Sequence, residues 1–281
     1  MAVKVVTDST ADIPRELAQE LGITVVPLSV IFGDRAYREG VDMDHDTFYR
    51  LLKEGRELPT TSAPSVGDFL RAYEEVLRET DEVVSIHISS KLSATYNNAC
   101  QAAAALQAKG ARIEVVDSLN VSMGMGFIVL AAARAAQAGA GLEQVVAIAR
   151  RCVERVRILV MLDTLEYLRR GGRIGRARAL LGALLQVKPI LSVRDGELHP
   201  EARVRTRSQA LERMLQLILA SPRIQEMGVG YSTEREEAEA LLERMRAAVP
   251  HARTYLVRIG PVVGTHAGPG VIGVGCLEGE E

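Results

Sequence analysis

Continuous apolar runs alternate with amphipathic segments along the first half of the chain. Four of these runs predict strands, namely residues 3–8, 23–32, 82–89 and 112–118. Helix signals lie between them: Asp12 and Pro14 suit a helix start, and Ser65 and Asp68 have the spacing of a capping box. This alternation predicts an α/β fold with a largely parallel sheet covered by helices.

The second half of the chain repeats this pattern after two helical stretches, residues 122–139 and 142–155. An apolar run at 157–163 predicts a new strand, and a hairpin is expected over 187–204 with its turn at Asp195-Gly196. Helices are predicted at 164–170, 177–185, 208–220 and 235–249, with strands at 227–232 and 253–260. We therefore expect two α/β lobes, 1–155 and 156–281, with mostly parallel or mixed sheets and a ligand between them.

Composition narrows the range of functions. The 281 residues carry a net charge of −2, which gives no global field for nucleic acid. No apolar stretch approaches the roughly 20 residues of a membrane-spanning helix, and no secretion leader precedes the first strand, so we predict a cytoplasmic protein. Cys100, Cys152 and Cys276 lie far apart, which predicts neither a disulfide framework nor a metal site.

Hydroxyl side chains gather where predicted strands lead into helices. Thr61 and Ser62 lie in the turn-rich segment 56–65, which we predict to be a loop, and Ser93 follows the strand at 82–89. Such hydroxyls commonly cap helices. Ser93 also lies in a loop after a buried strand, where the open edge of an α/β sheet can receive an anion. Asp8 ends the first strand. It is either the N-terminal cap of the next helix or a carboxylate that orients other groups near the site.

The segment 260–273, GPVVGTHAGPGVIG, holds His266 in what we interpret as a glycine-rich loop. Its glycines also fit G-x-G-x-x-G, but no helix and acidic residue can follow at the required spacing before residue 281, so a dinucleotide site is not predicted. His266 is either a surface residue or part of a site that the flanking glycines let the backbone approach closely. The segment 122–133, with Met123, Met125 and Phe127, suits either a ligand tail or ordinary core packing.

Several motifs together resemble the DegV family and span nearly the whole chain. They occur in the family's order: VTDSTADIP, LPTTSAPS, SSKLSATYNNA, VVDS, LEYLRRGGRI, VKPIL before DGEL, and GTHAGPG. The resemblance implies two α/β lobes that bury one long-chain fatty acid, such as palmitate. It further implies that the chain is a lipid-binding protein of fatty acid metabolism and not itself an enzyme, without a metal or other cofactor.

The resemblance also implies the residues of the site. The family's carboxylate-binding threonine and serine correspond to Thr61 and Ser93, and its nearby histidine corresponds to His266; we include the adjacent Ser62 in the predicted site. Some members present the carboxylate to a separate ATP-dependent kinase subunit that forms acyl phosphate. Arg170 and Arg173, in the R-G-G-R-I segment, are implied in docking that subunit. No nucleic acid partner is predicted, and transient contact with a membrane surface is left open.

Two alternatives remain at this point. Ser93, His266 and Asp8 are the residue types of a hydrolase triad, which would make the chain an acyl hydrolase. The arginines between 169 and 178 could instead serve a regulatory scaffold in which lipid is structural. For a carrier, about 14 methylenes at ~0.8 kcal/mol each give roughly 11 kcal/mol of gross transfer energy, so the tail would dominate affinity. Hydroxyls would satisfy the buried carboxylate.

Overall fold

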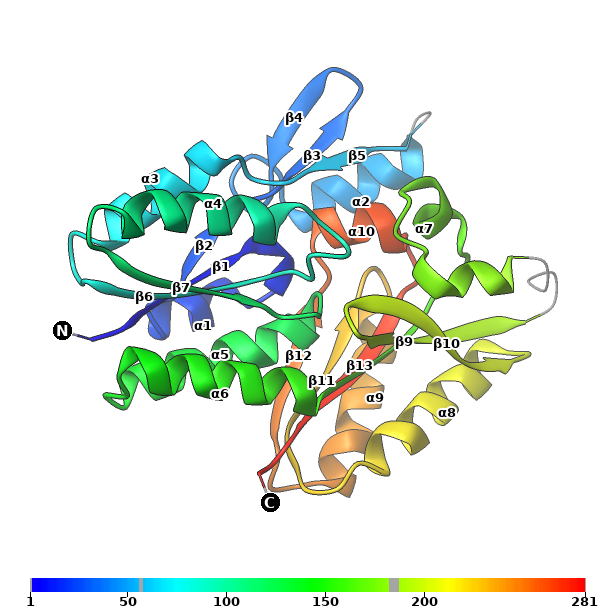
Figure 1. Cartoon of the computed structure of the whole chain (residues 1–281). Helices are drawn as coiled ribbons and strands as arrows, with labels where there is room; N and C mark the ends of the chain where they lie inside the picture. Colours follow the sequence, from blue (N-terminus) through cyan, green and yellow to red (C-terminus); the bar gives the residue numbers. More distant parts are fainter. Residues whose placement is uncertain (1, 56–57, 182–186, 281) are drawn as a thin grey trace.

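The computed structural model describes residues 2–55, 58–181 and 187–280 and confirms the predicted mixed α/β fold (Figure 1). Its strands form a four-stranded, a six-stranded and a three-stranded sheet. The four-stranded sheet uses the first half of the chain, and the six-stranded sheet uses the second half. Figure 1 shows the two larger sheets beside each other, with helices on their outer faces and between them.

The four-stranded sheet is entirely parallel, in the order β2-β1-β6-β7. Its strands are β1 (Lys4–Asp8), β2 (Thr24–Val26), β6 (Glu82–His87) and β7 (Arg112–Asp117). Because side chains alternate across a strand, Val6 and Val83 pack against one helix layer, and Val5 and Val84 against another. The first layer contains α3 (Val66–Val76) and α4 (Thr95–Gln107); the second contains α5 (Met123–Gln137) and α6 (Leu142–Arg155). A short helix, α1 (Arg15–Glu20), links β1 to β2.

The six-stranded sheet is mixed, in the order β10-β9-β8-β13-β11-β12. Its strands are β8 (Val156–Met161), β9 (Lys188–Arg194), β10 (Glu197–Val204), β11 (Ile224–Tyr231), β12 (Arg253–Arg258) and β13 (Ile272–Glu278). The predicted hairpin is confirmed as β9 and β10. Helices α8 (Arg207–Leu219) and α9 (Arg235–Ala248) cover one face, and α7 (Glu166–Arg170) packs beside the other.

The three-stranded antiparallel sheet corrects two predictions. Its strands are β3 (Ser29–Phe32), β4 (Arg35–Arg38) and β5 (Thr60–Ser62), and α2 (His45–Glu54) lies between β4 and β5 in the chain. The apolar run 23–32 is not one strand, because Pro27 and Leu28 separate β2 from β3 and send them to different sheets. The segment 56–65 is not wholly a loop, since residues 60–62 pair with β3.

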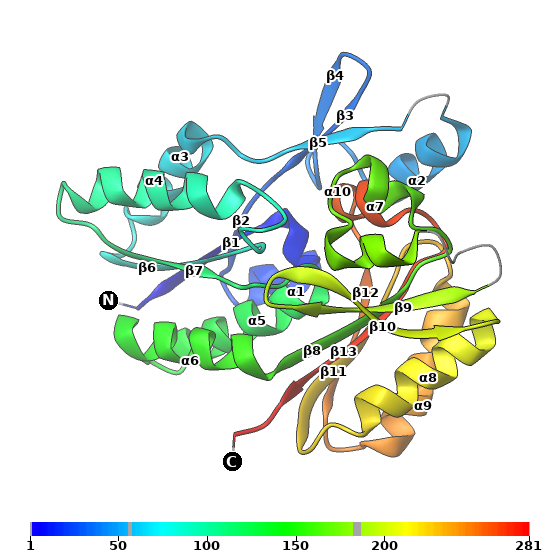
Figure 2. The ribbon, with the colours of Figure 1, turned by 45° about the vertical axis from the view of Figure 1, so that its right-hand side comes forward.

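The segment that carries His266 is also different from the prediction. Residues 261–267 form a helix, α10 (Pro261–Ala267), with proline in its first turn, and Gly268 ends it with a φ of 83°. The chain then enters β13, which was not predicted. Helix α10 packs against α7, as Figure 2 also shows. The helix predicted at 177–185 begins earlier as a 3₁₀ helix, Gly175–Leu180, and residues 182–185 of the prediction lie outside the described residues.

The proposed division into lobes 1–155 and 156–281 stays a prediction. Helix α5 contacts strands of both large sheets, so it belongs to the interface between them as much as to either side. Across the described part of the chain, none of the helices combines the length and apolar character needed to span a bilayer.

Candidate ligand-binding site

A cavity of about 240 Å³ lies between the two large sheets, and its walls are mainly apolar. Both halves of the chain contribute to it, together with β5 and α10 of the smaller layer. The apolar walls include Leu28, Ile88, Leu92, Ile158, Val160 and Leu162. Burying these walls against an apolar chain removes hydrocarbon surface from water, so the cavity suits a hydrophobic ligand.

Polar side chains from distant parts of the sequence meet on the wall of this cavity. Thr61 comes from β5 and His266 from the last turn of α10, and Thr61 Oγ1 lies 2.8 Å from His266 Nε2. Ser93 enters from the loop after β6 and lines the same cavity. All three are half-buried. The structure therefore brings the predicted residues Thr61, Ser93 and His266 to one cavity.

His266 is held in its neutral form by its surroundings. Burial, with a contribution from the Arg173 charge, lowers the pKa of His266 to about 4. Its Nδ1 is buried and has no hydrogen-bond partner among the described residues. That nitrogen lies against Gly171, where the β-carbon of any other residue would overlap the imidazole ring. The ring therefore turns Nε2 toward Thr61 and places Nδ1 against α7's C-terminal end.

Two buried carboxyl groups position the start of α10. Asp12 Oδ1 accepts a hydrogen bond from the Gly260 N–H at 2.9 Å, and Glu39 Oε1 accepts one from the Val262 N–H at 2.8 Å. Burial raises the pKa of Glu39 to about 7; burial and the nearby Glu39 raise the pKa of Asp12. These contacts tie α10, and with it His266, to the loop after β1 and to the end of β4.

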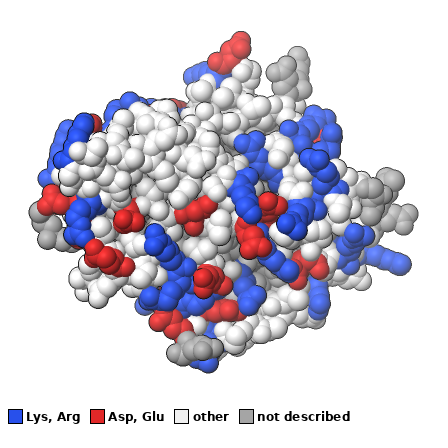
Figure 3. Space-filling view, in the orientation of Figure 1, with Lys and Arg blue, Asp and Glu red and all other residues white. Residues whose placement is uncertain are grey.

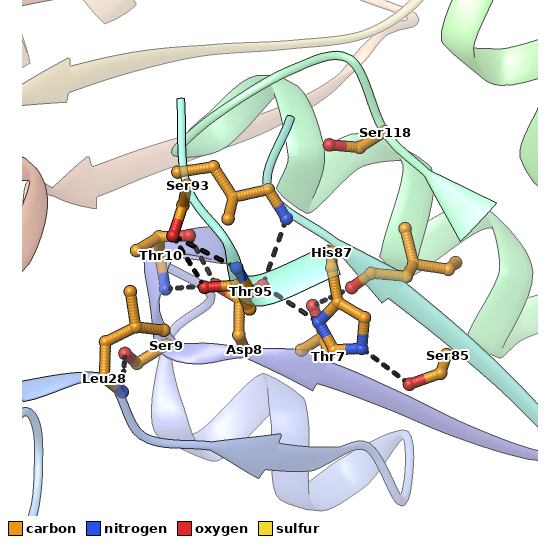
Figure 4. A network of polar contacts seen from close by, with 12 residues as sticks. Thr7, Asp8, Ser9, Thr10, Leu28, Ser85, His87, Ser93, Thr95 and Ser118 are labelled. Atoms are coloured by element: carbon orange, nitrogen blue, oxygen red, sulfur yellow. Dashed lines mark hydrogen bonds and ion pairs between the residues drawn. The ribbon is translucent and has the colours of Figure 1, made fainter. Parts of the chain in front are cut away.

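A second polar network fixes the strand ends behind the cavity (Figure 4). His87 Nδ1 lies 2.9 Å from Asp8 Oδ2, and His87 Nε2 lies 2.7 Å from Ser85 Oγ. Asp8 also accepts hydrogen bonds from the Ile88 N–H and from the N–H and hydroxyl of Thr10. Every member is buried, so the network joins the carboxyl ends of β1 and β6, from which Thr10 and the Ser93 loop extend toward the cavity.

The hydrolase triad that the sequence left open as an alternative is not assembled. Ser93 Oγ lies 2.8 Å from Thr95 Oγ1, whereas His266 contacts Thr61 and Asp8 contacts His87. Figure 4 shows Ser93 turned toward Thr95. A serine–histidine–aspartate arrangement does occur at Ser85, His87 and Asp8, but all three side chains are completely buried. No substrate could reach that serine without unfolding of the surrounding core.

Ser62 lies apart from the other predicted residues. Its neighbours Thr61 and Ala63 line the cavity, whereas Ser62 is exposed and its hydroxyl donates to the Ala63 carbonyl at 3.2 Å. Side chains alternate along a strand, so Ser62 faces the opposite side of β5 from Thr61. Its position gives no support to the predicted role in carboxylate binding.

The two predicted docking arginines lie in different environments. Arg170 is exposed and pairs with Glu166, as Arg169 does, and these hydrogen bonds lower the pKa of Glu166 to about 2. Arg173 instead lines the cavity and donates to the Leu92 carbonyl at 3.0 Å and the Gly171 carbonyl at 2.6 Å. Lys and Arg side chains are frequent on the right of Figure 3, where α7 lies in Figure 1.

Arg173 lines the cavity, although the sequence had implied a role for it in docking a kinase subunit. Its motif, R-G-G-R-I, identified an arginine-rich segment but gave no indication of which side chain turns inward.

The three large side chains of the segment 122–133 lie in two different environments. Met123 lines the cavity, whereas Met125 and Phe127 are buried in the core around α5, where the Phe127 ring packs against Tyr255 of β12. Among the described residues, no cluster of three or more histidine, cysteine or acidic side chains suits a metal ion.

Fold and site define a class of α/β protein in which two sheets enclose an apolar cavity with polar side chains on its wall. The DegV family model, described as "Uncharacterised protein, DegV family", matches residues 2–279, and the chain belongs to this family. Protein DegV of Bacillus subtilis is 36% identical over 278 residues, which cover 98% of each protein.

Two solved structures extend the comparison. A fatty-acid-binding DegV family protein from Thermus thermophilus superimposes with a TM-score of 0.91 at 36% identity, covering 99% of this chain and 100% of that one. A stearic acid-binding protein from Eubacterium ventriosum has a TM-score of 0.87 at 28% identity and covers 98% of both chains. Both of these proteins of the same fold bind fatty acids.

Proposed function

We propose that this chain binds one long-chain fatty acid, with the acyl tail in the cavity and the carboxylate beside Thr61, Ser93 and His266. The observation that carries the proposal is the meeting of these three side chains on the wall of an otherwise apolar cavity. The fatty-acid-binding relatives of the same fold support the same ligand class.

The head-group end combines neutral donors with one positive charge. Thr61 and Ser93 each carry a hydroxyl that can donate to a carboxylate: Ser93 by turning from Thr95, and Thr61 while Nε2–H of His266 donates to its oxygen. His266 is neutral near pH 7 and orients the Thr61 hydroxyl, and Arg173 supplies the charge that compensates the anion. Hydrogen bonds to a charged group contribute about 1.5–3 kcal/mol each, enough to offset part of the carboxylate's desolvation.

We infer further that the protein is a carrier in the cytoplasm and not itself an enzyme. In this proposal it presents the carboxylate to a separate ATP-dependent kinase subunit. A carboxylate oxygen attacks the γ-phosphorus of ATP, the acyl phosphate C–O–P linkage forms, and ADP leaves. The absence of an assembled triad at Ser93 supports the carrier over the hydrolase.

Mass spectrometry of an organic extract tests the ligand. Purified, denatured protein should release about one equivalent of fatty acid, and the double variant Thr61→Ala/Ser93→Ala should release far less. Loss of both hydroxyl hydrogen bonds to the carboxylate, at about 1.5–3 kcal/mol each, weakens affinity by roughly 100-fold to 10,000-fold. If the native protein carries no fatty acid and binds none when supplied, the proposal is wrong.

Docking of the kinase subunit is tested at Arg170 and not at Arg173. Because Arg173 lines the cavity, replacing it would change lipid binding as well as docking. Arg169 and Arg170 both pair with Glu166, so they form a matched pair of exposed arginines. Arg170→Ala should reduce acyl phosphate formation by a purified fatty acid kinase subunit while leaving lipid occupancy unchanged. Arg169→Ala should leave both unchanged. Equal rates for the two variants and the native protein would remove Arg170 from the docking proposal.

A further inference from the structure

The far end of the cavity lies where two strands of the six-stranded sheet separate. Strands β8 and β9 are paired from Met161 with Ile190 to Leu159 with Ser192. The next residues in that register are Ile158 and Val193, which are no longer paired although both strands continue past them. A gap therefore opens in the sheet beyond this point.

A second hollow of about 590 Å³ occupies that gap, and it shares a wall with the lipid cavity. Of the residues that the structure describes, Ile158 and Val193 line both spaces. The second hollow is more polar: Arg157, Arg194, Glu201 and Glu278 line it, and Ser192 Oγ there is buried without a partner among the described residues. The two side chains thus separate an apolar space from a polar one.

The pairing of β13 with β8 places the wall formed by Ile158 and Val193 away from Thr61 and His266. The chain after α10 returns beside β8, with Ile272 opposite Met161 and Gly275 opposite Ile158. Leu162, just past β8, is therefore at the His266 end, and Ile158 lies roughly 13 Å further along the strand. A fatty acid with its carboxylate at Thr61 and His266 would direct its tail toward Ile158.

The Ile158 side chain is held in place by two glycines. A β-carbon on Gly124 would come within 2.7 Å of Ile158 Cγ1, and one on Gly275 would overlap Cδ1. Helix α5 and strand β13 therefore approach Ile158 so closely that its side chain has little room to rotate. A fixed isoleucine makes a wall at a defined depth, unlike a flexible methionine, which would yield to a longer tail.

We propose that Ile158 and Val193 set the maximum length of the bound acyl tail, and that the hollow behind them receives longer tails when either side chain is shortened. This inference rests on the proposed fatty acid function. Each methylene that becomes buried favours the longer acid by about fourfold, so opening the wall changes the preferred chain length measurably.

Competition among saturated fatty acids of 14 to 20 carbons tests the wall. Each protein is exchanged against an equimolar mixture in excess, and the bound acids are extracted and quantified by mass spectrometry. Val193→Ala and Val160→Ala form the matched pair, because they remove the same atoms and Val160 lines only the lipid cavity. Ile158→Ala is the stronger change at the same wall.

We expect Val193→Ala and Ile158→Ala to raise the ratio of bound 18-carbon to 16-carbon acid at least fivefold. Complete burial of two more methylenes would give about sixteenfold. Val160→Ala should leave the ratio within twofold of the native protein. If Val193→Ala matches Val160→Ala, the wall does not set tail length, and this result stands even where Ile158→Ala fails to fold. If no variant and not even the native protein binds any acid, the proposed function itself fails.

Discussion

Two histidines in this protein, His87 and His266, have opposite surroundings. His87 is completely buried and has a partner at each ring nitrogen, Asp8 at Nδ1 and Ser85 at Nε2. Within the described part of the chain, His266 has one partner, Thr61, and none at Nδ1, and it lines the cavity. A polar side chain with every hydrogen bond satisfied inside the protein stabilises the fold. His266 instead lines the cavity, where a ligand can reach the ring and its partner Thr61.

This comparison also shows why residue types alone misidentify a catalytic centre. The geometry that resembles a serine–histidine–aspartate triad belongs to the buried His87, where it holds β1 and β6 together. The serine and histidine singled out from the sequence, Ser93 and His266, have separate partners and meet on the cavity wall. Access to a cavity, and not the presence of a triad, separates the functional residues from the structural ones.

Replacing each histidine by alanine should give the largest contrast. His87→Ala leaves a buried cavity and unsatisfied groups on Asp8 and Ser85, so we expect a loss of about 3–5 kcal/mol in the free energy of unfolding. His266→Ala should cost about 1 kcal/mol or less but weaken fatty acid binding at least tenfold. Urea unfolding at pH 7.5 and binding titrations measure the two effects. Equal losses of stability in both variants would contradict the division of roles.

The pH dependence of stability sharpens the comparison. An unfolded histidine has a pKa of about 6.5, whereas that of folded His266 is about 4, so protons bind preferentially to the unfolded chain. The contribution of neutral His266 is therefore fully present above pH 6.5 and is lost as the pH falls toward 4. Between pH 7.5 and 4.5, the free energy of unfolding of the lipid-free native protein should fall by about 2–3 kcal/mol more than that of the His266→Gln variant.

The comparison with His266→Gln is needed because other groups titrate with the opposite sign. The raised pKa values of Asp12 and Glu39 stabilise the folded chain at low pH, and their contribution is lost as the pH rises toward 7. Subtracting the two unfolding curves cancels these carboxyl groups. Parallel curves for the native protein and the glutamine variant would show that His266 does not titrate as described.

A smaller effect is expected at Gly171, which touches His266 but does not line the cavity. The backbone of Gly171 suits any residue, so Gly171→Ala acts by displacing the imidazole, and we expect fatty acid affinity to fall about tenfold. Gly141→Ala is the control, because nothing lies within 4 Å of its new methyl group. Displacement of a fluorescent fatty acid measures both; unchanged affinity in Gly171→Ala would argue against a role for the ring's position.

The parallel β-α units were predictable from the sequence because apolar runs and helix caps recur at regular intervals. The capping box at Ser65 and the turn at Asp195 were confirmed for the same reason. The three-stranded sheet was missed because β4 is mostly polar and β5 has three residues, so neither has a strand pattern of its own. Their pairing with β3 is a tertiary effect.

The site was predictable as a set of residues but not as an arrangement. Thr61, Ser93 and His266 followed from motifs, whereas the contact between Thr61 and His266 joins positions 205 residues apart. The inward direction of Arg173 depends on carbonyl groups of Leu92 and Gly171 that only the fold brings together. Which end of the cavity receives the carboxylate likewise depends on the order of β8 and β13.

The orientation of the bound fatty acid can be measured directly with palmitate labelled with ¹³C at its carboxyl carbon. We predict that Ser93→Ala changes the chemical shift of the bound carboxyl carbon and its dependence on pH, whereas Val193→Ala at the far wall leaves both unchanged. The reverse result, a shift altered by Val193→Ala and unaffected by Ser93→Ala, would place the carboxylate at the wrong end and contradict the central claim.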